Sequence, residues 1–309
     1  MYTQFFGLSE APFSISPNPK YLYMSERHGE ALAHLNYGLQ DGGGFVLLTG
    51  EVGTGKTTVS RCLLQQLPAD TEIAYILNPS LTERDLLAAI CDEYQLPYGA
   101  DAGLKTLFDL IRDHLLANLA AGKRSVVLVD EAQHLLPGVL EQLRLLTNLE
   151  TEQRKLLQVV LFGQPELDVT LARHEFRQLL QRITFSYRLR PLDVRDTQRY
   201  LQERLAVAGY RGEPLFAPRA VGVLVRGSSG IPRLLNILAH KALMAAFGDG
   251  SRQVTASHVR RAMADTEGAQ PFRHWSPRWL SLGLAAGTLS VAVLLGAWPW
   301  LKQWSGWWS

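Results

Sequence analysis

Apolar and polar positions follow two alternating patterns between residues 45 and 189. Short apolar runs, typical of strands buried on both faces, are each followed by a stretch in which apolar residues recur with the period of a helix. Strand and helix in turn predict an α/β fold, a doubly wound parallel sheet with helices on both faces. The expected strands are Phe45–Leu48, Ile73–Leu77, Ser125–Glu131, Leu157–Phe162 and Ile183–Leu189, and the expected helices are 59–67, 82–95, 104–121, 137–149 and one that ends near 181.

Two further regions flank this alternating core. Residues 1–25 hold three prolines among aromatic residues, which predicts an extended, ordered arm. A helix is expected over residues 25–39, with Ser25 as its N-cap. From residue 193 to about 265 the pattern is helical throughout, which predicts a second, smaller, all-helical domain. Its expected helices are Asp193–Ala208, Ala217–Arg226, Pro232–Phe247 and Ala256–Met263.

The end of the chain has a different composition. The 23 residues 279–301 carry no formal charge. As a helix they would be about 34 Å long, enough for a hydrocarbon core of roughly 30 Å. A buried core helix would also be apolar, but it explains neither this length nor the tryptophans at both ends, which are typical of an aromatic belt. We therefore expect a transmembrane helix, flanked by Trp275, Trp279, Trp298, Trp300 and Trp304.

Basic residues are more frequent before this span than after it. Arg260, Arg261, Arg273 and Arg278 precede it, and Lys302 follows it. The positive-inside rule therefore places the N-terminal side in the cytoplasm. The expected domains are an arm and helix at 1–40, an α/β domain at 41–191, a helical lid at 192–266, a linker at 267–278, the span at 279–301 and a short periplasmic tail at 302–309.

Composition narrows the class of protein. At 309 residues, with 47% hydrophobic and 19% charged residues, the chain is globular and long enough for two domains. The net charge of +2 disfavours a dedicated nucleic-acid binder. The N-terminus lacks a basic region followed by an apolar run, so no cleavable signal is expected. Both cysteines, Cys62 and Cys91, fall in helical patterns and are expected to be buried and reduced.

A glycine-rich segment joins the first expected strand to the helix that follows it. It matches the pattern G-x-x-x-x-G-K-[ST], whose glycines let backbone amides approach phosphate closely. A helix N-terminus after such a loop favours an anion. The alternative is a chance match, but the strand before the segment and the helix after it are the context that the motif requires. The segment predicts a nucleotide site formed by Gly50, Glu51, Val52, Gly53, Thr54, Gly55, Lys56, Thr57 and Thr58, with Lys56 on the outer phosphates and Thr57 on magnesium.

Polar residues follow two other strands of the predicted sheet. Asp130 and Glu131 come after an apolar run, at the carboxyl edge where open α/β sheets bind ligands. There an aspartate can hold magnesium and a glutamate can polarise the attacking water. The alternative is that these are acidic residues at the N-terminus of a helix, which are common. The order of a glycine loop followed by an acidic strand end favours the functional interpretation. Gln164 follows the next strand, where its amide is expected to orient water near the γ-phosphate. The alternative is an ordinary surface glutamine in a turn beside Pro165, and the context of the other motifs favours the functional interpretation.

Arginines form the last group of candidates. Arg233 lies in the first turn of an expected helix, where a cation opposes the helix dipole and a bound phosphate would relieve that penalty. Arg182 lies between a helix and a strand, where it is expected to reach the nucleotide of a neighbouring subunit, with Arg177 as its competitor. A solvated surface arginine is the alternative for each. Nine arginines against four acids between residues 173 and 211 are also suited to subunit contacts or to a polyanion.

Together these segments resemble AAA+ ATPases. More closely, they resemble the general secretion pathway protein A and MSHA pilus biogenesis protein M family of bacterial membrane-linked ATPases, the pilus member being nearer. The resemblance covers about residues 1–265. It is carried by Phe6-Gly-Leu, Pro12-Phe, Gly50-Glu-Val-Gly-Thr-Gly-Lys-Thr, Val129-Asp-Glu-Ala-Gln, Leu143-Arg-Leu-Leu-Thr-Asn-Leu-Glu, Phe162-Gly-Gln-Pro-Glu-Leu, Gln181-Arg-Ile-Thr-Phe-Ser-Tyr-Arg-Leu-Arg-Pro-Leu and Gly230-Ile-Pro-Arg-Leu-Leu-Asn-Ile-Leu-Ala-His-Lys-Ala.

The resemblance implies roles for single residues. It implies an AAA+ P-loop sheet domain with a helical lid, ATP and Mg²⁺ as ligands, and an oligomer. Lys56 and Thr57 would form the Walker A pair, Asp130 and Glu131 the Walker B pair. Gln164 would be sensor 1, Arg233 sensor 2 and Arg182 the arginine finger. Secretion-type members also carry a periplasmic peptidoglycan-binding region, which is not expected within the eight residues that follow the span here.

The expected function is that of an inner-membrane ATPase. Hydrolysis of ATP would drive assembly of a MSHA-type (type IV) pilus or a type II secretion apparatus, with inner-membrane or periplasmic assembly proteins as partners. One alternative is a DNA-handling AAA+ ATPase of the transposition type, which the arginine-rich stretch permits and the low net charge disfavours. Another is a membrane scaffold that binds ATP with little turnover.

Overall fold

The computed structural model describes residues 1–15, 18–40, 44–77, 80–152 and 154–269. The described residues belong to one compact unit, Met1–Gln270. The expected span at 279–301 and the tail at 302–309 lie outside the described residues. Within the described part of the chain, no helix has both the length and the apolar character that crossing a bilayer requires.

The described residues contain one sheet of five strands in the order β2-β3-β4-β1-β5. Each pair of neighbours runs parallel, with β1 hydrogen-bonded to both β4 and β5. Strands β1 and β4 are buried along their whole length, as their continuous apolar runs predict. The predicted parallel sheet is therefore confirmed, with strands β1 Phe45–Gly50, β2 Thr71–Ile76, β3 Arg124–Val129, β4 Gln158–Gly163 and β5 Ile183–Leu189.

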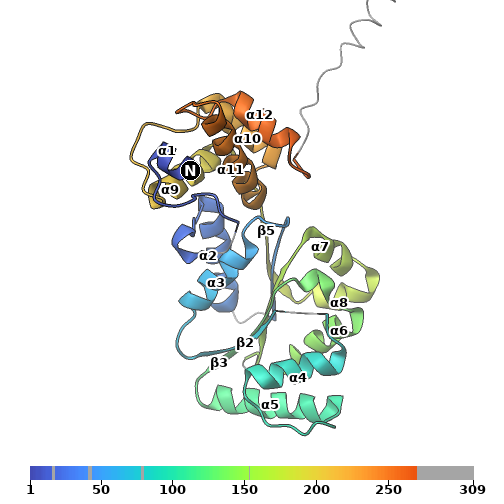
Figure 1. The fold of residues 1–309 in the computed structure, drawn as a ribbon. Helices are drawn as coiled ribbons and strands as arrows, with labels where there is room; N and C mark the ends of the chain where they lie inside the picture. Colours follow the sequence, from blue (N-terminus) through green and yellow to red (C-terminus); the bar gives the residue numbers. More distant parts are fainter. Residues whose placement is uncertain (16–17, 41–43, 78–79, 153, 270–309) are drawn as a thin grey trace, which may run out of the picture. The chain divides into compact units, whose positions relative to one another are not determined.

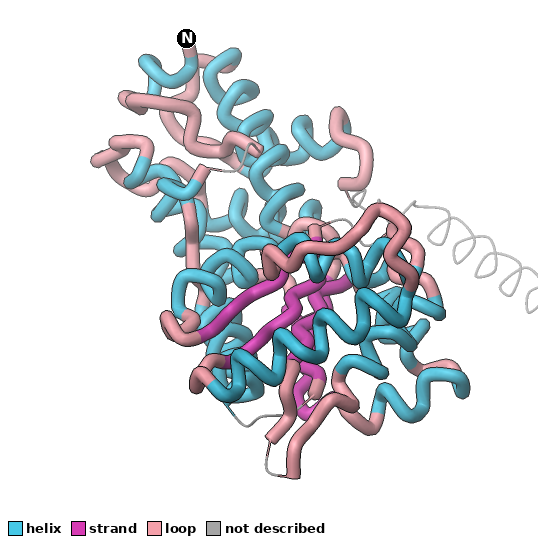
Figure 2. The backbone as a smooth tube through the Cα atoms, turned by 90° about the horizontal axis from the view of Figure 1, so that it is seen from below, coloured by secondary structure: helices cyan, strands magenta, loops and turns pink. Residues whose placement is uncertain are grey.

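Helices cover both faces of this sheet (Figures 1 and 2). Helices α2 (Glu26–Gln40) and α3 (Lys56–Gln66) bury Leu35 and Leu63 on one face, against a layer that includes Leu48 of β1. The other face packs against α4, α5, α6 and α7. Cys62 and Cys91 are both buried and free, as predicted. The helices of this second layer are α4 Glu83–Glu93, α5 Leu104–Ala120, α6 Pro137–Leu146, α7 Pro165–Leu171 and α8 Arg177–Leu180.

The expected single helix before residue 181 is wrong in detail. Helix α7 ends at Leu171, a 3₁₀ turn spans His174–Phe176, and the short helix α8 follows. Phe176 and Leu179 are buried in the same core as α7. Each short segment therefore contributes its own apolar residue to this core, where one continuous helix was expected. The expected helix at 59–67 begins earlier, at Lys56, because Gly55 provides a left-handed cap with φ of 104°.

The predicted all-helical character of the lid is confirmed within the described residues. Helices α9 Val194–Val207, α10 Pro218–Ser228, α11 Pro232–Gly248 and α12 Ala256–Ala264 share one apolar core. Proline occupies the first turn of α10 and α11, where its missing N–H is not needed. Asp193 caps α9 by accepting a hydrogen bond from the Asp196 N–H at 2.8 Å.

The N-terminal arm differs from the expectation of an extended segment. Tyr2–Phe6 forms a helix, α1, which ends at Gly7 in the left-handed conformation with φ of 70°. A 3₁₀ turn, η1, spans Pro19–Tyr21. The arm belongs to the core of the lid rather than to a separate unit with α2, because its apolar residues pack among α9–α12. These residues are Phe6, Leu8, Phe13 and Tyr21.

A buried arginine fixes the arm on the lid. Arg204 of α9 donates hydrogen bonds to the Pro12 carbonyl at 2.6 Å and to the Ser14 carbonyl at 3.2 Å. Its guanidinium also lies 4.6 Å from the centre of the Tyr21 ring, within the range of a cation–π contact. The chain therefore starts in the lid, crosses to the sheet domain at α2 and returns to the lid after β5.

This arrangement makes the arm a source of stability for the lid. We expect Phe13→Ala to lower the free energy of unfolding by about 3–5 kcal/mol, because it leaves a cavity at a side chain that is 2% exposed. Val169→Ala, at a side chain 69% exposed, is the control and should change it by less than about 0.5 kcal/mol. Urea denaturation measures both. Equal effects would show that the arm is not part of the core.

Candidate nucleotide site

Three strand ends bring most of the predicted site residues to one edge of the sheet. The glycine loop, residues 50–55, follows β1, Asp130 follows β3, and Gln164 follows β4. Because all strands are parallel, their carboxyl ends meet at the same edge, where open α/β sheets bind ligands. Nine of the fourteen predicted site residues line one cavity at this edge: Val52, Gly53, Thr54, Gly55, Lys56, Thr57, Thr58, Glu131 and Arg233.

Lys56 is buried and points back at its own loop. Its Nζ donates to the Gly50 carbonyl at 2.8 Å and to the Glu51 carbonyl at 3.2 Å, and the residue is 6% exposed. Burial lowers the pKa of Lys56, and the nearby carboxylates of Glu131 and Asp130 oppose that shift. Among the residues that the structure describes, no carboxylate lies within ion-pair distance of this ammonium, so an anion such as a phosphate would give it a stronger partner than the two carbonyls.

Asp130 and Thr57 form the candidate magnesium site. The Thr57 hydroxyl lies 3.4 Å from Asp130 Oδ2, and the Tyr75 hydroxyl lies 3.5 Å from the same oxygen. Asp130 is 4% exposed, and burial raises its pKa although the Glu131 N–H donates to Oδ1 at 2.9 Å. A buried carboxylate and a hydroxyl facing each other are oxygen donors of the kind that Mg²⁺ takes together with phosphate oxygens. These residues therefore fit the ion.

Glu131 is held in an unusual backbone conformation and by two amides. Its φ of 54° and ψ of 37° are left-handed, a region that non-glycine residues rarely occupy and that clusters at functional sites. Gln133 Nε2 donates to Glu131 Oε2 at 2.5 Å, and Gln164 Nε2 donates to the same oxygen at 3.1 Å. Burial raises the pKa of Glu131, but these hydrogen bonds and Lys56 outweigh burial and hold it below its usual value.

Gln133 is a site residue that sequence reasoning missed. Besides donating to Glu131, its Oε1 accepts a hydrogen bond from the Gln164 backbone N–H at 3.0 Å. It therefore joins the end of β4 to the turn after β3. Its place two residues after Glu131 was a signal that could have been followed, but glutamines in such turns are usually solvated.

The three glycines of the loop are needed for packing inside the protein. A Cβ at Gly50 would lie 2.9 Å from the Leu189 carbonyl oxygen, and a Cβ at Gly53 would lie 2.7 Å from the Arg233 Cβ. A Cβ at Gly55 would lie 2.6 Å from the ring of His28. Gly53 and Gly55 also have positive φ. The loop is therefore in close contact with the end of β5, the lid and α2 at once.

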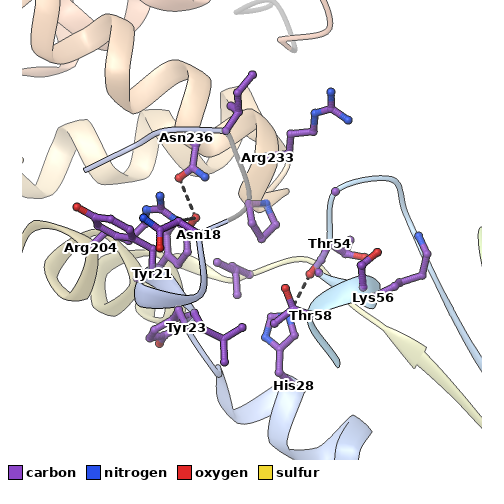
Figure 3. Close-up of a pocket in the computed structure, with 18 of the residues that line it drawn as sticks. Asn18, Tyr21, Tyr23, His28, Thr54, Lys56, Thr58, Arg204, Arg233 and Asn236 are labelled. Carbon is purple, nitrogen blue, oxygen red and sulfur yellow. Dashed lines mark hydrogen bonds between the residues drawn. The ribbon is translucent and has the colours of Figure 1, made fainter. Parts of the chain in front are cut away.

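The cavity extends from the glycine loop to the lid and the arm (Figure 3). Its volume of about 500 Å³ lies in the range of small-molecule sites. Arg233 reaches it from the first turn of α11, and its backbone N–H lies 3.4 Å from the Gly53 carbonyl. Figure 3 shows Arg233 above the loop and His28 below it.

The far end of the cavity was not predicted. Tyr200 of α9 donates to Asn236 Oδ1 at 2.8 Å, and Arg204 Nη1 lies 3.3 Å from the Tyr200 hydroxyl. Asn18 and Tyr23 of the arm also line this end. These residues come from the arm and the lid, so their proximity depends on the fold of two remote segments and has no local sequence signal.

Arg182 and Arg177 lie away from this cavity. Arg182 precedes β5, and its carbonyl accepts from the Phe45 N–H at 3.1 Å, at the amino edge of the sheet. Its guanidinium reaches the Thr147 carbonyl at 3.4 Å. The seven residues of β5 separate it from the ligand edge, a distance of about 20 Å. Neither arginine lines the cavity of its own chain, so a role at a nucleotide would require a neighbouring copy.

The buried carboxyl of Asp130 is expected to reduce stability. Burial raises the pKa of Asp130 in the folded protein, so folding favours the protonated carboxyl. The resulting stability is fully present below the pKa of the unfolded state and is lost as pH rises through the pKa of the folded state. We therefore expect Asp130→Asn to raise the free energy of unfolding at pH 7 by about 1 kcal/mol. Urea denaturation should show the gain shrinking toward acidic pH. The exposed ion-pair variant Asp109→Asn should show no gain, and a loss for Asp130→Asn at pH 7 would contradict the prediction.

Comparison with known proteins identifies the domain. Residues 39–171 match the family model described as an AAA domain. General secretion pathway protein A of Aeromonas hydrophila is 69% identical over 300 residues, which cover 97% of this chain and 54% of that protein. The chain thus spans about half the length of this relative. The resemblance to the secretion family that the sequence motifs predicted is confirmed.

Solved structures show the same fold at low identity. The ORC2 protein of Aeropyrum pernix has a TM-score of 0.59 at 18% identity and covers 85% of this chain and 73% of its own. Cdc6p of Pyrobaculum aerophilum has a TM-score of 0.60 at 19% identity and covers 82% of this chain and 70% of its own. The chain is therefore a homologue of general secretion pathway protein A that contains an AAA domain, with an α/β P-loop fold and a helical lid.

Proposed function

We propose that this chain is a magnesium-dependent ATPase of a bacterial secretion or pilus assembly apparatus. The observation that carries the proposal is that Lys56, Thr57 and Glu131 line one cavity at the carboxyl edge of the sheet, with Asp130 beside Thr57. The relation to general secretion pathway protein A supports the cellular role. The cavity opposite the loop is large enough for a nucleotide, since its volume is about 500 Å³.

Each polar group of the site has a task in hydrolysis. Lys56 would leave the Gly50 and Glu51 carbonyls and neutralise charge on the outer phosphates, and the backbone N–H groups of the loop would bind the phosphate oxygens. Glu131 would accept a proton from the attacking water. Its lowered pKa keeps it ionised at neutral pH, so the carboxylate is available to accept that proton. Gln164, 3.1 Å from Glu131, would hold the water in line with the phosphorus.

Thr57 and Asp130 would hold a magnesium ion. When bound, Mg²⁺ neutralises charge on the β- and γ-phosphate oxygens. The ion would also stabilise the ionised form of Asp130, because a cation next to the buried carboxylate opposes the rise in its pKa that burial causes. Tyr75, which lies against the same carboxylate oxygen, would keep it oriented.

The lid and a neighbouring copy would complete the site. Arg233 stands beside Gly53 and would contact the γ-phosphate as a sensor, so that nucleotide state changes the contact between lid and loop. Arg182, or its competitor Arg177, would reach the nucleotide of the next protomer in an oligomer. An apparatus in the inner membrane would receive these changes through the span proposed at 279–301, and periplasmic or inner-membrane assembly proteins would be the partners.

Glu131→Gln tests the reaction. We expect the rate of ATP hydrolysis to fall about 100-fold or more while MgATP binding is kept, because the amide cannot take the proton from water but fills the same space. Release of phosphate and binding of a fluorescent ATP analogue measure the two effects separately.

The matched control is Glu141→Gln, which alters an exposed carboxylate paired with Arg144 on α6. Hydrolysis by this variant should equal that of the unaltered protein. If Glu131→Gln turns over ATP at the unaltered rate, the chain binds nucleotide as a scaffold and the hydrolytic role proposed for Glu131 is wrong.

A further inference from the structure

Several carbonyl groups of the glycine loop have hydrogen-bond partners within the protein. Lys56 holds the Gly50 and Glu51 carbonyls, and Arg233 approaches the Gly53 carbonyl. The Thr54 carbonyl has a partner from a different part of the chain: His28 Nε2, on α2, lies 3.0 Å from it. A carbonyl is an acceptor, so this contact requires the Nε2–H tautomer of His28.

The other side of the ring fixes that tautomer. His28 Nδ1 lies 2.6 Å from the Ser25 hydroxyl and 3.3 Å from the Ser25 N–H, both of which can donate to it. The Ser25 Oγ also accepts from the His28 N–H at 3.3 Å, so the residues form the cap at the start of α2. Burial lowers the pKa of His28, which favours the neutral ring that this pattern needs.

The ring is packed as closely as it is hydrogen-bonded. His28 is 4% exposed, and Gly55 comes so near that a Cβ there would lie 2.6 Å from Nε2. Gly55 is the N-cap of α3, directly before Lys56. A shift of the ring would therefore displace Thr54 and Gly55, the two residues that lead into the first turn of α3.

The residue before His28 contacts the lid. Arg27 donates to the Pro191 carbonyl and to the Asp193 carboxylate, the latter at 3.1 Å. Asp193 is the N-cap of α9, the first helix of the lid after the sheet. Adjacent residues of α2 thus touch the start of the lid and the glycine loop.

From these contacts we infer that His28 is a positioning residue for the glycine loop. It holds the Thr54–Gly55 segment in the conformation that receives a triphosphate, and it ties this conformation to α2, which Arg27 links to the lid. The inference rests on the proposed function in one respect, that the loop binds a triphosphate. It means that α2 contributes to binding of the phosphates, whatever the base of the nucleotide.

His28 also lines the cavity, so contact with the base or the sugar is the competing role. Inorganic tripolyphosphate separates the two, since it has neither base nor sugar. A positioning residue affects tripolyphosphate and ATP by the same factor, whereas a residue that touches the base or the sugar affects ATP alone.

Two conservative variants isolate the contact with Thr54. His28→Asn keeps a polar atom near Ser25 but is too short to reach the Thr54 carbonyl. His28→Gln is long enough for its Nε2 to donate there. The matched control is His258→Asn in the lid: His258 is also 4% exposed and also approaches its helix cap, Thr255, through Nδ1 at 3.3 Å, but its Nε2 bonds Asp249 away from the cavity.

The experiment is titration calorimetry of the full chain in detergent with Mg²⁺ and either ATP or tripolyphosphate. We expect His28→Asn to weaken binding of both ligands about tenfold, since it leaves a buried carbonyl unpaired, and His28→Gln to stay within about threefold of the unaltered protein. His258→Asn should bind both ligands normally. Thermal unfolding of all three variants shows whether a loss of binding follows from loss of the fold.

The outcomes separate this inference from the proposed function. Three results would overturn the positioning role and leave the ATPase proposal intact. These are unchanged binding by His28→Asn, a loss of binding by His28→Asn that is confined to ATP, and an equal loss of binding in His258→Asn. Binding of both ligands without hydrolysis by the unaltered protein would overturn the ATPase proposal and leave His28 in its role. If the unaltered protein bound neither ligand, both would fall.

Discussion

The close contact of one loop with three other elements determines how this site is built. Gly50 touches the end of β5, Gly53 touches the first turn of α11, and Gly55 touches the ring of His28 on α2. None of these contacts leaves space for a methyl group. The glycine loop is therefore the point where sheet, lid and α2 meet, and its shape depends on all three. A ligand that changes the loop must change at least one of these contacts, which is how binding can be felt in the lid.

The parallel sheet sets the chemistry around that loop. Because the carboxyl ends of β1, β3 and β4 lie at one edge, a lysine, two acids and two glutamines come together from segments far apart in the chain. Their environments then separate the two acids. Burial raises the pKa of Asp130, while amide hydrogen bonds and Lys56 lower that of Glu131. A cation beside Asp130 would offset the effect of its burial, whereas Glu131 stays ionised beside Lys56. The two carboxyl groups differ in this way although they belong to consecutive residues, and Glu131 has a left-handed backbone.

Much of this could be predicted from the sequence because it is local. Strand β5 was placed at its observed ends, and the glycine loop, Asp130, Glu131 and Gln164 were found from strand ends and motif spacing. The arm, His28 and Gln133 could not be placed in the same way. Phe13 packs in a core formed by α9–α12, and His28 meets a loop 26 residues away, so their roles depend on contacts that no local period encodes. The finger role proposed for Arg182 would depend on a second copy, which one chain cannot supply.

The most direct measurement is binding of MgATP to the full chain in detergent, compared with binding to Lys56→Ala and Lys123→Ala. Lys56 is buried at the loop, whereas Lys123 precedes β3 at the opposite edge of the sheet. Saturable binding by the unaltered protein and by Lys123→Ala, lost in Lys56→Ala by a factor of about 100, is the result expected for a charged group buried against phosphate. Equal binding by all three proteins would contradict the placement of the nucleotide at this loop.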